Sequence, residues 1–159
     1  MRGMRRSNQR TDHEQARRIL AEAEYGVLST ACDDGMPYGI PLNYALSGNN
    51  VYFHCAPEGT KLDNIRRDSR ACLTAVLRQR NLGNRLTTAY ESAMAFGVVH
   101  VVSDEEERQT AFRLLAGKYA PSLPEEALAA YLVKYGPKAV ILRMEVEYLT
   151  GKSGHADQL

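Results

Sequence analysis

The side chains best suited to chemistry lie in a short part of the chain, between residues 41 and 61. A histidine can donate a proton near neutral pH. A lysine that follows a glycine turn at a predicted helix start can bind a phosphate together with the free backbone N–H groups there, and a threonine hydroxyl can add a donor. The residues concerned are Pro41, Leu42, Asn43, Tyr44, Phe53, His54, Gly59, Thr60 and Lys61.

Each of these residues also has a structural interpretation. Thr60 and Lys61 would then form an ordinary helix start with a solvated lysine. Tyr44 would be a core residue and Asn43 a polar residue at a strand end. A single histidine such as His54 is more often structural than catalytic. The residue types alone leave these alternatives open.

Other motifs for catalysis or metal binding are absent from the sequence. Residues 150–153 (T-G-K-S) resemble the end of a phosphate-binding P-loop, but that motif requires glycine where Val146 stands. The four histidines show no metal-ligand spacing and the three cysteines form no C-x-x-C pair. No metal site is therefore expected.

The elements that position the candidate residues are mostly β-strands that follow one another closely. Turn sequences such as Asp33-Asp34-Gly35 separate them, and such a meander favours an antiparallel barrel over a βαβ sheet. Residues 81–87 are predicted as a loop. The predicted strands, about six in number, are 27–31, 37–46, 51–55, 71–77, 90–102 and 139–148. The four predicted helices are 12–24, a short helix that contains residues 62–66 and ends near residues 68–69, 103–120 and 125–135.

Three local features refine this prediction. Thr11 and Glu14 have the spacing of a capping box at a helix start. Pro37 and Pro41 have no backbone N–H, so their strand is expected at the edge of the sheet. Gly97 lies inside a predicted strand, which indicates a bulge or bend.

The composition fits one small globular domain. The chain has 159 residues, 44% of them hydrophobic, and a formal net charge of +1. Proteins that bind nucleic acid usually carry more positive charge, so no nucleic-acid partner is expected. Apolar runs fall short of the roughly 20 residues of a membrane span, and no signal peptide is apparent, so we expect no membrane contact and a cytoplasmic location. The sequence predicts a flexible basic arm at residues 1–10, a single domain at residues 11–153 and a tail at residues 154–159.

Several short motifs, taken in order, resemble the FMN-binding split-barrel proteins, the pyridoxamine 5'-phosphate oxidase-like family. The resemblance is strongest to the nitroimidazole-resistance branch and extends over about residues 10–153. The order and spacing of the motifs make it specific. They are G-V-L-S-T (26–30), D-G-M-P-Y (34–38), P-L-N-Y (41–44), V-Y-F-H-C-A-P-E-G-T-K-L-D (51–63), Y-E-S (90–92), F-G (96–97), K-Y-A-P (118–121) and T-G-K (150–152).

The resemblance implies a mainly β fold with flanking helices, an antiparallel split β-barrel that binds FMN. It also implies a homodimer with FMN at the subunit interface. The backbone of residues 42–44 would hydrogen-bond the flavin ring, and His54 would lie near the ring as the catalytic residue. The cofactor-binding residues that it implies are Pro41, Leu42, Asn43, Tyr44, Phe53, His54, Thr60, Lys61 and Ser92.

Two functional hypotheses follow from the resemblance. The first is an FMN-dependent, nitroreductase-like oxidoreductase that reduces a small organic acceptor, such as a nitroimidazole, with electrons from a reduced nicotinamide. The alternative is a non-catalytic flavin or haem carrier or sensor of the same fold. No motif identifies a nicotinamide site. Oxidation of pyridoxamine phosphate is disfavoured, because the arginine-rich C-terminal segment that we associate with that activity is absent.

Overall fold

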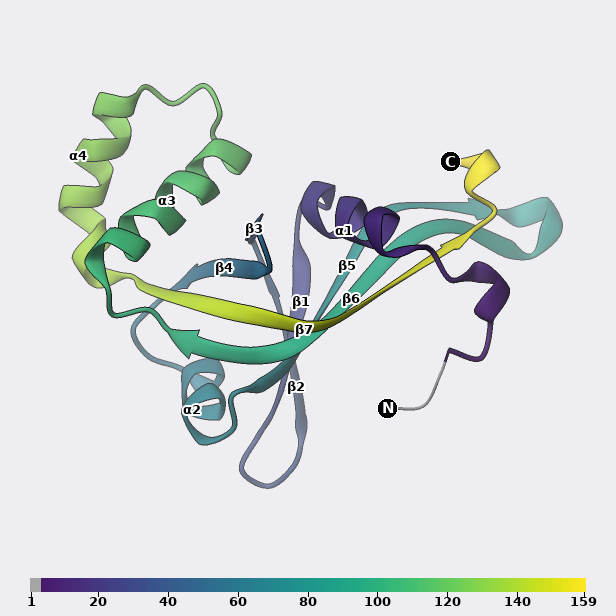
Figure 1. The fold of residues 1–159 in the computed structure, drawn as a ribbon, viewed down its shortest axis with the longest axis horizontal. Coiled ribbons are helices and arrows are strands. Elements are labelled where there is room, and N and C mark those ends of the chain that lie inside the picture. The colour runs from purple at the N-terminus through teal and green to yellow at the C-terminus, as the bar shows by residue number, and fades with distance from the viewer. Residues whose placement is uncertain (1–3) are drawn as a thin grey trace.

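One antiparallel sheet of seven strands dominates the computed structural model, which describes residues 4–159. Its order is β2-β1-β5-β6-β7-β4-β3 (Figure 1). The predicted mainly β fold with flanking helices is confirmed. The strands are β1 (Gly26–Ala31), β2 (Pro37–Leu42), β3 (Ala45–Ser47), β4 (Asn50–Cys55), β5 (Arg70–Leu82), β6 (Thr87–Val101) and β7 (Val140–Gly154).

Four α-helices flank the sheet within the described part of the chain. The first two pack against the barrel, whereas the last two form a lobe beside β3 and β4 (Figure 1). Short 3₁₀ turns also occur at Ser7–Gln9, Gly83–Arg85, Gly136–Lys138 and Ala156–Gln158. The helices are α1 (His13–Glu22), α2 (Thr60–Arg67), α3 (Glu105–Tyr119) and α4 (Glu125–Tyr135).

The sheet curls into a split barrel that does not close. Its two edge strands, β2 and β3, are separated in sequence only by Asn43 and Tyr44, yet each pairs with a different neighbour. The predicted strand 37–46 is therefore two strands, which explains why seven are observed where about six were expected. Pro37 and Pro41 lie in edge strand β2, as predicted.

The core fills the inside of this curled sheet. Ile19 and Leu20 of α1 and Leu62 and Ile65 of α2 pack against the inner side chains of the strands. A second cluster lies on the outer face of β4 and β7, where Phe112 of α3 covers the sheet. Strand β4 is thus covered on both sides, and its alternate residues enter different clusters.

Gly97 forms the bulge that the sequence predicts. The register between β6 and β7 shifts between Phe96 and Gly97. A Cβ atom on Gly97 would lie 1.8 Å from the backbone oxygen of Glu145. Only glycine permits this close approach of the two strands.

Two local predictions are wrong. Asp12 rather than Thr11 caps α1, since its Oδ1 accepts a 2.7 Å hydrogen bond from the Gln15 N–H. Residues 81–87 are not a loop. Strand β5 continues to Leu82, strand β6 begins at Thr87, and one 3₁₀ turn joins the two strands. Backbone pairing with the neighbouring strand therefore outweighs the turn-forming residues in this segment.

The chain ends are partly packed. Residues 1–3 of the predicted arm lie outside the described residues. Arg10 forms a bridge with Lys152, and the Tyr90 hydroxyl donates a 3.0 Å hydrogen bond to the side-chain oxygen of Gln9. The flexibility of the arm stays a prediction.

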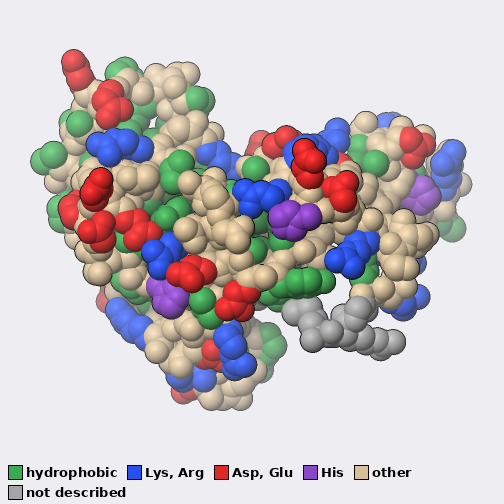
Figure 2. All heavy atoms as spheres, in the orientation of Figure 1, with side chains coloured by type: hydrophobic (Ala, Val, Ile, Leu, Met, Phe, Trp, Pro, Cys, Tyr) green, Lys and Arg blue, Asp and Glu red, His purple; other side chains and the backbone are tan. Residues whose placement is uncertain are grey.

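The surface carries charges of both signs. In Figure 2, acidic and basic side chains are interspersed over the visible face rather than separated into large patches. No helix among residues 4–159 has both the length and the apolar character needed to cross a membrane. The same residues hold no group of three His, Cys, Asp or Glu side chains able to bind a metal ion.

Candidate functional site

Two of the predicted site residues, Asn43 and His54, line one pocket. It has a volume of about 290 Å³ and lies between β4, α3 and α4. Asn43 comes from the connection between the two edge strands, whereas His54 is near the end of β4. The remaining lining residues are Phe112, Leu115, Ala116, Tyr119, Ala120, Leu123, Leu128, Tyr131, Leu132, Tyr135 and Ala139.

His54 is exposed because successive side chains of β4 point to opposite faces of the sheet. Its neighbour Phe53 is fully buried in the main core, where its ring centroid lies 6.3 Å from that of Tyr44. His54 points to the opposite side of the strand, next to the pocket. The structure therefore leaves His54 free to touch a ligand, whereas Phe53 supports the strand from within.

Tyr44 is a core residue that fixes the connection between β2 and β3. Its hydroxyl donates a 2.5 Å hydrogen bond to the backbone oxygen of Leu20, and burial raises its pKa. Its backbone N–H donates to the hydroxyl of Tyr119 at 2.9 Å. The Lys118 ammonium lies 4.2 Å from the centre of the Tyr44 ring. Tyr44 therefore holds Asn43 in place, and its side chain has no access to a ligand.

The end of β2 supplies an edge next to Asn43. Pro41 is exposed and Leu42 is half-buried. They pair with Val27 and Gly26 of β1, and no strand of residues 4–159 covers their other side. Backbone groups at this edge remain available to a flat ligand.

Thr60 and Lys61 begin α2, a third part of the candidate site. The N-cap residue is Gly59 with φ of 120°, and no described side chain caps the helix. Lys61 is only 8% exposed, although no described residue forms a hydrogen bond or ion pair with its ammonium. Asn64 anchors the helix by donating a 3.0 Å hydrogen bond to the Thr30 hydroxyl.

Ser92 is not brought together with the other residues in one copy of the chain. His54 pairs with Ile141, whose neighbour Leu142 pairs with Val101 of β6. Ser92 lies nine residues before Val101, or about 30 Å along the strand at roughly 3.3 Å per residue. Ser92 and His54 therefore occupy distant ends of the sheet.

Helix α3 carries functional residues that sequence reasoning did not assign. The Tyr119 hydroxyl binds the backbone of Tyr44, and the Lys118 ammonium donates a 2.7 Å hydrogen bond to the backbone oxygen of Ala23. Burial lowers the pKa of Lys118. The K-Y-A-P motif contains both residues, so a signal existed, but their role depends on a contact far away in sequence.

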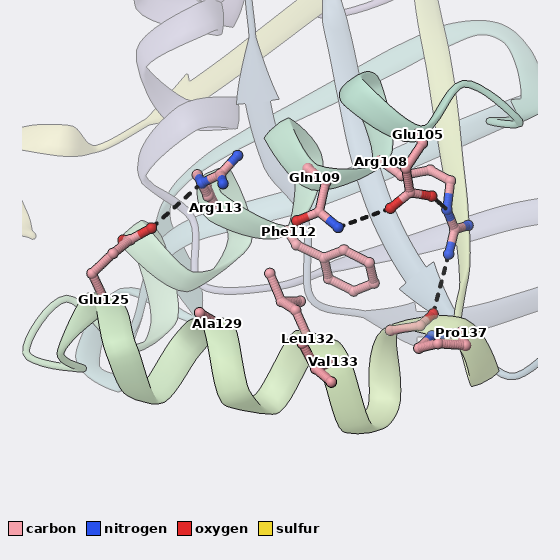
Figure 3. Close-up of a pocket in the computed structure, with 11 residues that line it drawn as sticks. Glu105, Arg108, Gln109, Phe112, Arg113, Glu125, Ala129, Leu132, Val133 and Pro137 are labelled. Atoms are coloured by element: carbon pink, nitrogen blue, oxygen red, sulfur yellow. Dashed lines mark hydrogen bonds and ion pairs between the residues drawn. The ribbon is translucent and has the colours of Figure 1, made fainter.

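A second pocket lies on the other side of the contact between α3 and α4 (Figure 3). Its volume is about 420 Å³, but its charged side chains already pair with one another. Arg108 binds Glu105 at 3.1 Å, and Arg113 lies 3.6 Å from Glu125. None of the predicted site residues lines it, whereas Asn43 and His54 line the first pocket, which is therefore the candidate site.

The structure is an open split barrel with a pocket between β4, α3 and α4 and a helix, α2, that begins without a side-chain cap among the described residues. The chain belongs to the pyridoxamine 5'-phosphate oxidase family, whose sequence profile matches residues 12–153. This confirms the resemblance drawn from the motifs. No curated protein is similar enough in sequence to match.

Solved structures share the fold. One is a candidate 5-nitroimidazole antibiotic resistance protein of Bacteroides thetaiotaomicron, 24% identical, covering 89% of this chain and 83% of that one, with a TM-score of 0.72. A FAD-binding protein of Mesorhizobium loti is 21% identical, with coverages of 91% and 96% and a TM-score of 0.69. A FAD- and haem-binding protein of Mycobacterium smegmatis is 15% identical, with coverages of 92% and 74% and a TM-score of 0.71.

Proposed function

We propose that this chain binds FMN and acts as an oxidoreductase that reduces a small organic acceptor with electrons from a reduced nicotinamide. Membership of the pyridoxamine 5'-phosphate oxidase family and the flavin-binding proteins of the same fold support a flavin. FMN, when bound, supplies the hydride-accepting and electron-releasing chemistry that amino-acid side chains lack. The protein contributes binding, orientation and proton supply.

The observation that carries the proposal is the environment of Lys61. The Lys61 side chain is largely buried, and its ammonium, which is not among the buried atoms without a partner, has no hydrogen-bond or ion-pair partner among residues 4–159 and can therefore reach a ligand. The first-turn N–H groups of α2 also lack a side-chain cap. A phosphate dianion matches both, because it accepts hydrogen bonds from the N–H groups, the Thr60 hydroxyl and the ammonium.

The ring of the flavin would be held at the edge of β2. Pro41, Leu42 and Asn43 present backbone groups and one side-chain amide there, and the Tyr119 contact to Tyr44 fixes their position. His54 is exposed at the same pocket as Asn43. It is the residue we assign to proton donation to the reduced acceptor.

A homodimer would complete the site. The outer face of β1, β5, β6 and β7 exposes apolar side chains, and the register aligns Val27, Thr74 and Met94 in one row across it. Met94 is 38% exposed and Val76, opposite Ser92, is 51% exposed. If two copies pack through this face, Ser92 of the partner subunit can reach a flavin that Ser92 of the same copy cannot.

The second candidate function is a flavin or haem carrier without turnover. The FAD- and haem-binding protein of the same fold favours it, and His54 is an exposed histidine beside an apolar pocket. The visible spectrum of a haem carrier would differ from that of a flavoprotein. A Soret band after purification would support this alternative.

The first experiment is a visible spectrum of the purified protein, followed by release and identification of its chromophore. We expect the two absorption bands of oxidised flavin and the release of FMN. Anaerobic addition of a reduced nicotinamide should bleach the bands. A colourless protein that also rejects added FMN would contradict the proposal, and bands that no donor bleaches would favour the carrier.

Lys61→Met tests the phosphate contact. We expect a loss of FMN affinity of about 10- to 100-fold, because charge-assisted hydrogen bonds contribute about 1.5–3 kcal/mol. Riboflavin, which has no phosphate, should bind both proteins equally. Arg66→Met is the matched control, since Arg66 is an exposed cation of the same helix. Equal loss for FMN and riboflavin would show that Lys61 has only a structural role.

A further inference from the structure

Two positively charged side chains lie beside Ser92 on the outer face of the sheet. Ser92 of β6 pairs with Lys152 of β7, and Lys152 forms a bridge with Arg10 of the N-terminal segment. Figure 1 shows this segment beside the ends of β6 and β7. Because side chains of directly paired residues point to the same face of a sheet, Ser92, Lys152 and Arg10 form one row, which we call the cationic row.

The side chains next to this row along the chain point to the inner face. A Cβ atom on Gly151 would lie 2.1 Å from the Thr11 hydroxyl and 2.8 Å from the Cβ of Ala16 in α1. Helix α1 therefore covers the inner side of β7 at this point. Since successive side chains of a strand alternate between faces, Lys152 and its neighbour Ser92 face outward, onto the surface that we assign to the subunit contact.

The cations of the row have no carboxylate partner among residues 4–159. Neither Lys152 nor Arg10 forms an ion pair there, and the Lys152 ammonium lies 5.5 Å from the centre of the Tyr90 ring. Two cations on an otherwise uncharged face require an anion once a partner subunit covers that face. The paired residues of β5, β6 and β7 in the two adjacent rows are all uncharged: Thr74, Met94, Thr150, Gln79, Tyr90 and Gly154.

We propose that the cationic row binds the phosphate groups of the electron donor, and that this donor is NADPH. The inference rests on the proposed function, in which Ser92 of the partner subunit reaches the flavin. Lys152 and Arg10 of that subunit then follow at one and two strand spacings, or about 5 and 10 Å. A nicotinamide ring that reaches the flavin is followed by a ribose and then by the diphosphate, so the anionic part of the donor extends along the row.

The preference for NADPH over NADH follows from the amount of positive charge. Arg5 and Arg6 precede Arg10 in the same segment, and both are exposed. NADH offers them only its diphosphate, whereas NADPH adds a phosphate monoester with a charge of about −1.5 to −2 at pH 7. Guanidinium groups bind such a phosphate through two parallel hydrogen bonds. The additional phosphate therefore gains partners that a dinucleotide without it leaves unused.

Binding of the oxidised dinucleotides tests the row without turnover. NADP⁺ and NAD⁺ are titrated calorimetrically into the protein as purified, at low salt. We expect NADP⁺ to bind at least about tenfold more tightly than NAD⁺. Sodium chloride at about 0.5 M should remove most of this difference, because salt screens exposed charges. Equal affinities for the two dinucleotides at low salt would refute the preference for NADPH.

Three variants locate the site. Lys152→Met should weaken NADP⁺ binding by about 10- to 100-fold through the loss of a charge-assisted hydrogen bond, and Lys152→Arg should retain most of the affinity. Arg10→Met should weaken it by about two- to tenfold, since Arg10 is exposed. Arg85→Met is the matched control. Arg85 is an exposed arginine at the tip of the β5–β6 hairpin, outside the row.

The outcomes separate this inference from the proposed function. Unchanged NADP⁺ binding in Lys152→Met, or an equal loss in Arg85→Met, would overturn the donor site while leaving a flavin spectrum intact. A protein without flavin that binds NADP⁺, and loses it in Lys152→Met, would keep the cationic row and refute the flavin chemistry.

Two further measurements exclude other roles of Lys152. If Lys152→Met weakens FMN binding and leaves NADP⁺ binding unchanged, the row holds the flavin phosphate and the donor site is refuted. Light scattering should give the same mass for Lys152→Met and the wild type. A monomeric Lys152→Met protein that binds neither nucleotide would show that this lysine holds the dimer together, and the inference would be wrong.

Discussion

The Tyr119 hydroxyl lies 2.9 Å from both the backbone nitrogen and the backbone oxygen of Tyr44. It also reaches the backbone oxygen of Glu24 at 2.6 Å. One side chain thus connects the end of α3 to the point where the chain passes from one edge of the sheet to the other. Asn43, next to Tyr44, depends on this contact for its place in the pocket.

Tyr119→Phe should lower the free energy of unfolding by about 1–3 kcal/mol, because the N–H of Tyr44 loses its acceptor in a largely buried position. Urea unfolding measures this change, and FMN titration should show weaker binding through the displaced edge at Asn43. The control is Tyr135→Phe, whose hydroxyl has no hydrogen bond to a described residue. A change below about 0.5 kcal/mol in Tyr119→Phe would mean that α3 does not hold this connection.

Gly97→Ala should destabilise the fold by at least about 2 kcal/mol, since the added Cβ would overlap the backbone oxygen of Glu145 and the strands must separate. Thermal and urea unfolding provide the measurement. Gly117→Ala is the matched control. A Cβ on Gly117 meets nothing within 4 Å, and alanine is the better helix former, so stability should rise by up to about 1 kcal/mol. Equal behaviour of the two variants would remove the role of the bulge.

Glu91→Gln should destabilise the protein by about 2 kcal/mol. Glu91 is almost fully buried and binds Arg18 at 2.7 Å and Arg78 at 2.5 Å. Both guanidinium groups are more than a third exposed, so the cost should be below the 3–5 kcal/mol of a fully buried pair. Glu22→Gln removes an exposed carboxylate on Arg18 and should change stability by less than about 0.5 kcal/mol.

Acid denaturation gives an independent test of Glu91. Burial alone would raise its pKa, but the hydrogen bonds and charges of Arg78 and Arg18 outweigh burial and hold the pKa below 4.5. A lowered folded-state pKa contributes stability that is complete above the unfolded pKa and is lost as the pH falls through the folded value. Stability should therefore fall less steeply below pH 4.5 in Glu91→Gln than in the wild type. Identical slopes would contradict this assignment.

The sequence predicts the strands and the order of the motifs because alternation and turn residues are local properties. It also predicts the bulge at Gly97 and the edge position of Pro37 and Pro41, since each has a covalent cause. The division of residues 37–46 into β2 and β3 was missed. It depends on which strand pairs with each half, and that partner is set by tertiary contacts rather than by local pattern.

The candidate site likewise has some features that the sequence predicts and others that only the structure shows. The motif indicates Lys61 and His54, but only the structure shows that Lys61 is nearly buried and that His54 shares a pocket with Asn43. The role of Tyr119 depends on a contact 75 residues away in sequence. From the sequence, Tyr131 belongs to an ordinary apolar helix face, and only the structure shows that its side chain is exposed and lines this pocket.

Met94→Lys should prevent dimer formation, because it places a charge in the middle of the exposed apolar row that we assign to the subunit contact. Light scattering after size-exclusion chromatography measures the mass, and FMN affinity should fall with the loss of the partner's Ser92. Leu86→Lys at the hairpin tip is the control, since Leu86 is 96% exposed and outside that row. A dimeric Met94→Lys protein would place the interface elsewhere.

His54→Gln should lower kcat for reduction of a small organic acceptor such as a nitroimidazole by about 10- to 100-fold, toward the lower end of general acid catalysis, because the glutamine cannot donate a proton to the reduced acceptor. FMN should stay bound, since the phosphate contact at Lys61 is unaffected. Stopped-flow reduction of the flavin by the nicotinamide should be unchanged, and only the acceptor half-reaction should slow. His100→Gln is the matched control, because His100 is an exposed strand histidine outside the pocket. If both half-reactions keep their wild-type rates in His54→Gln, the proton comes from solvent and His54 only shapes the pocket.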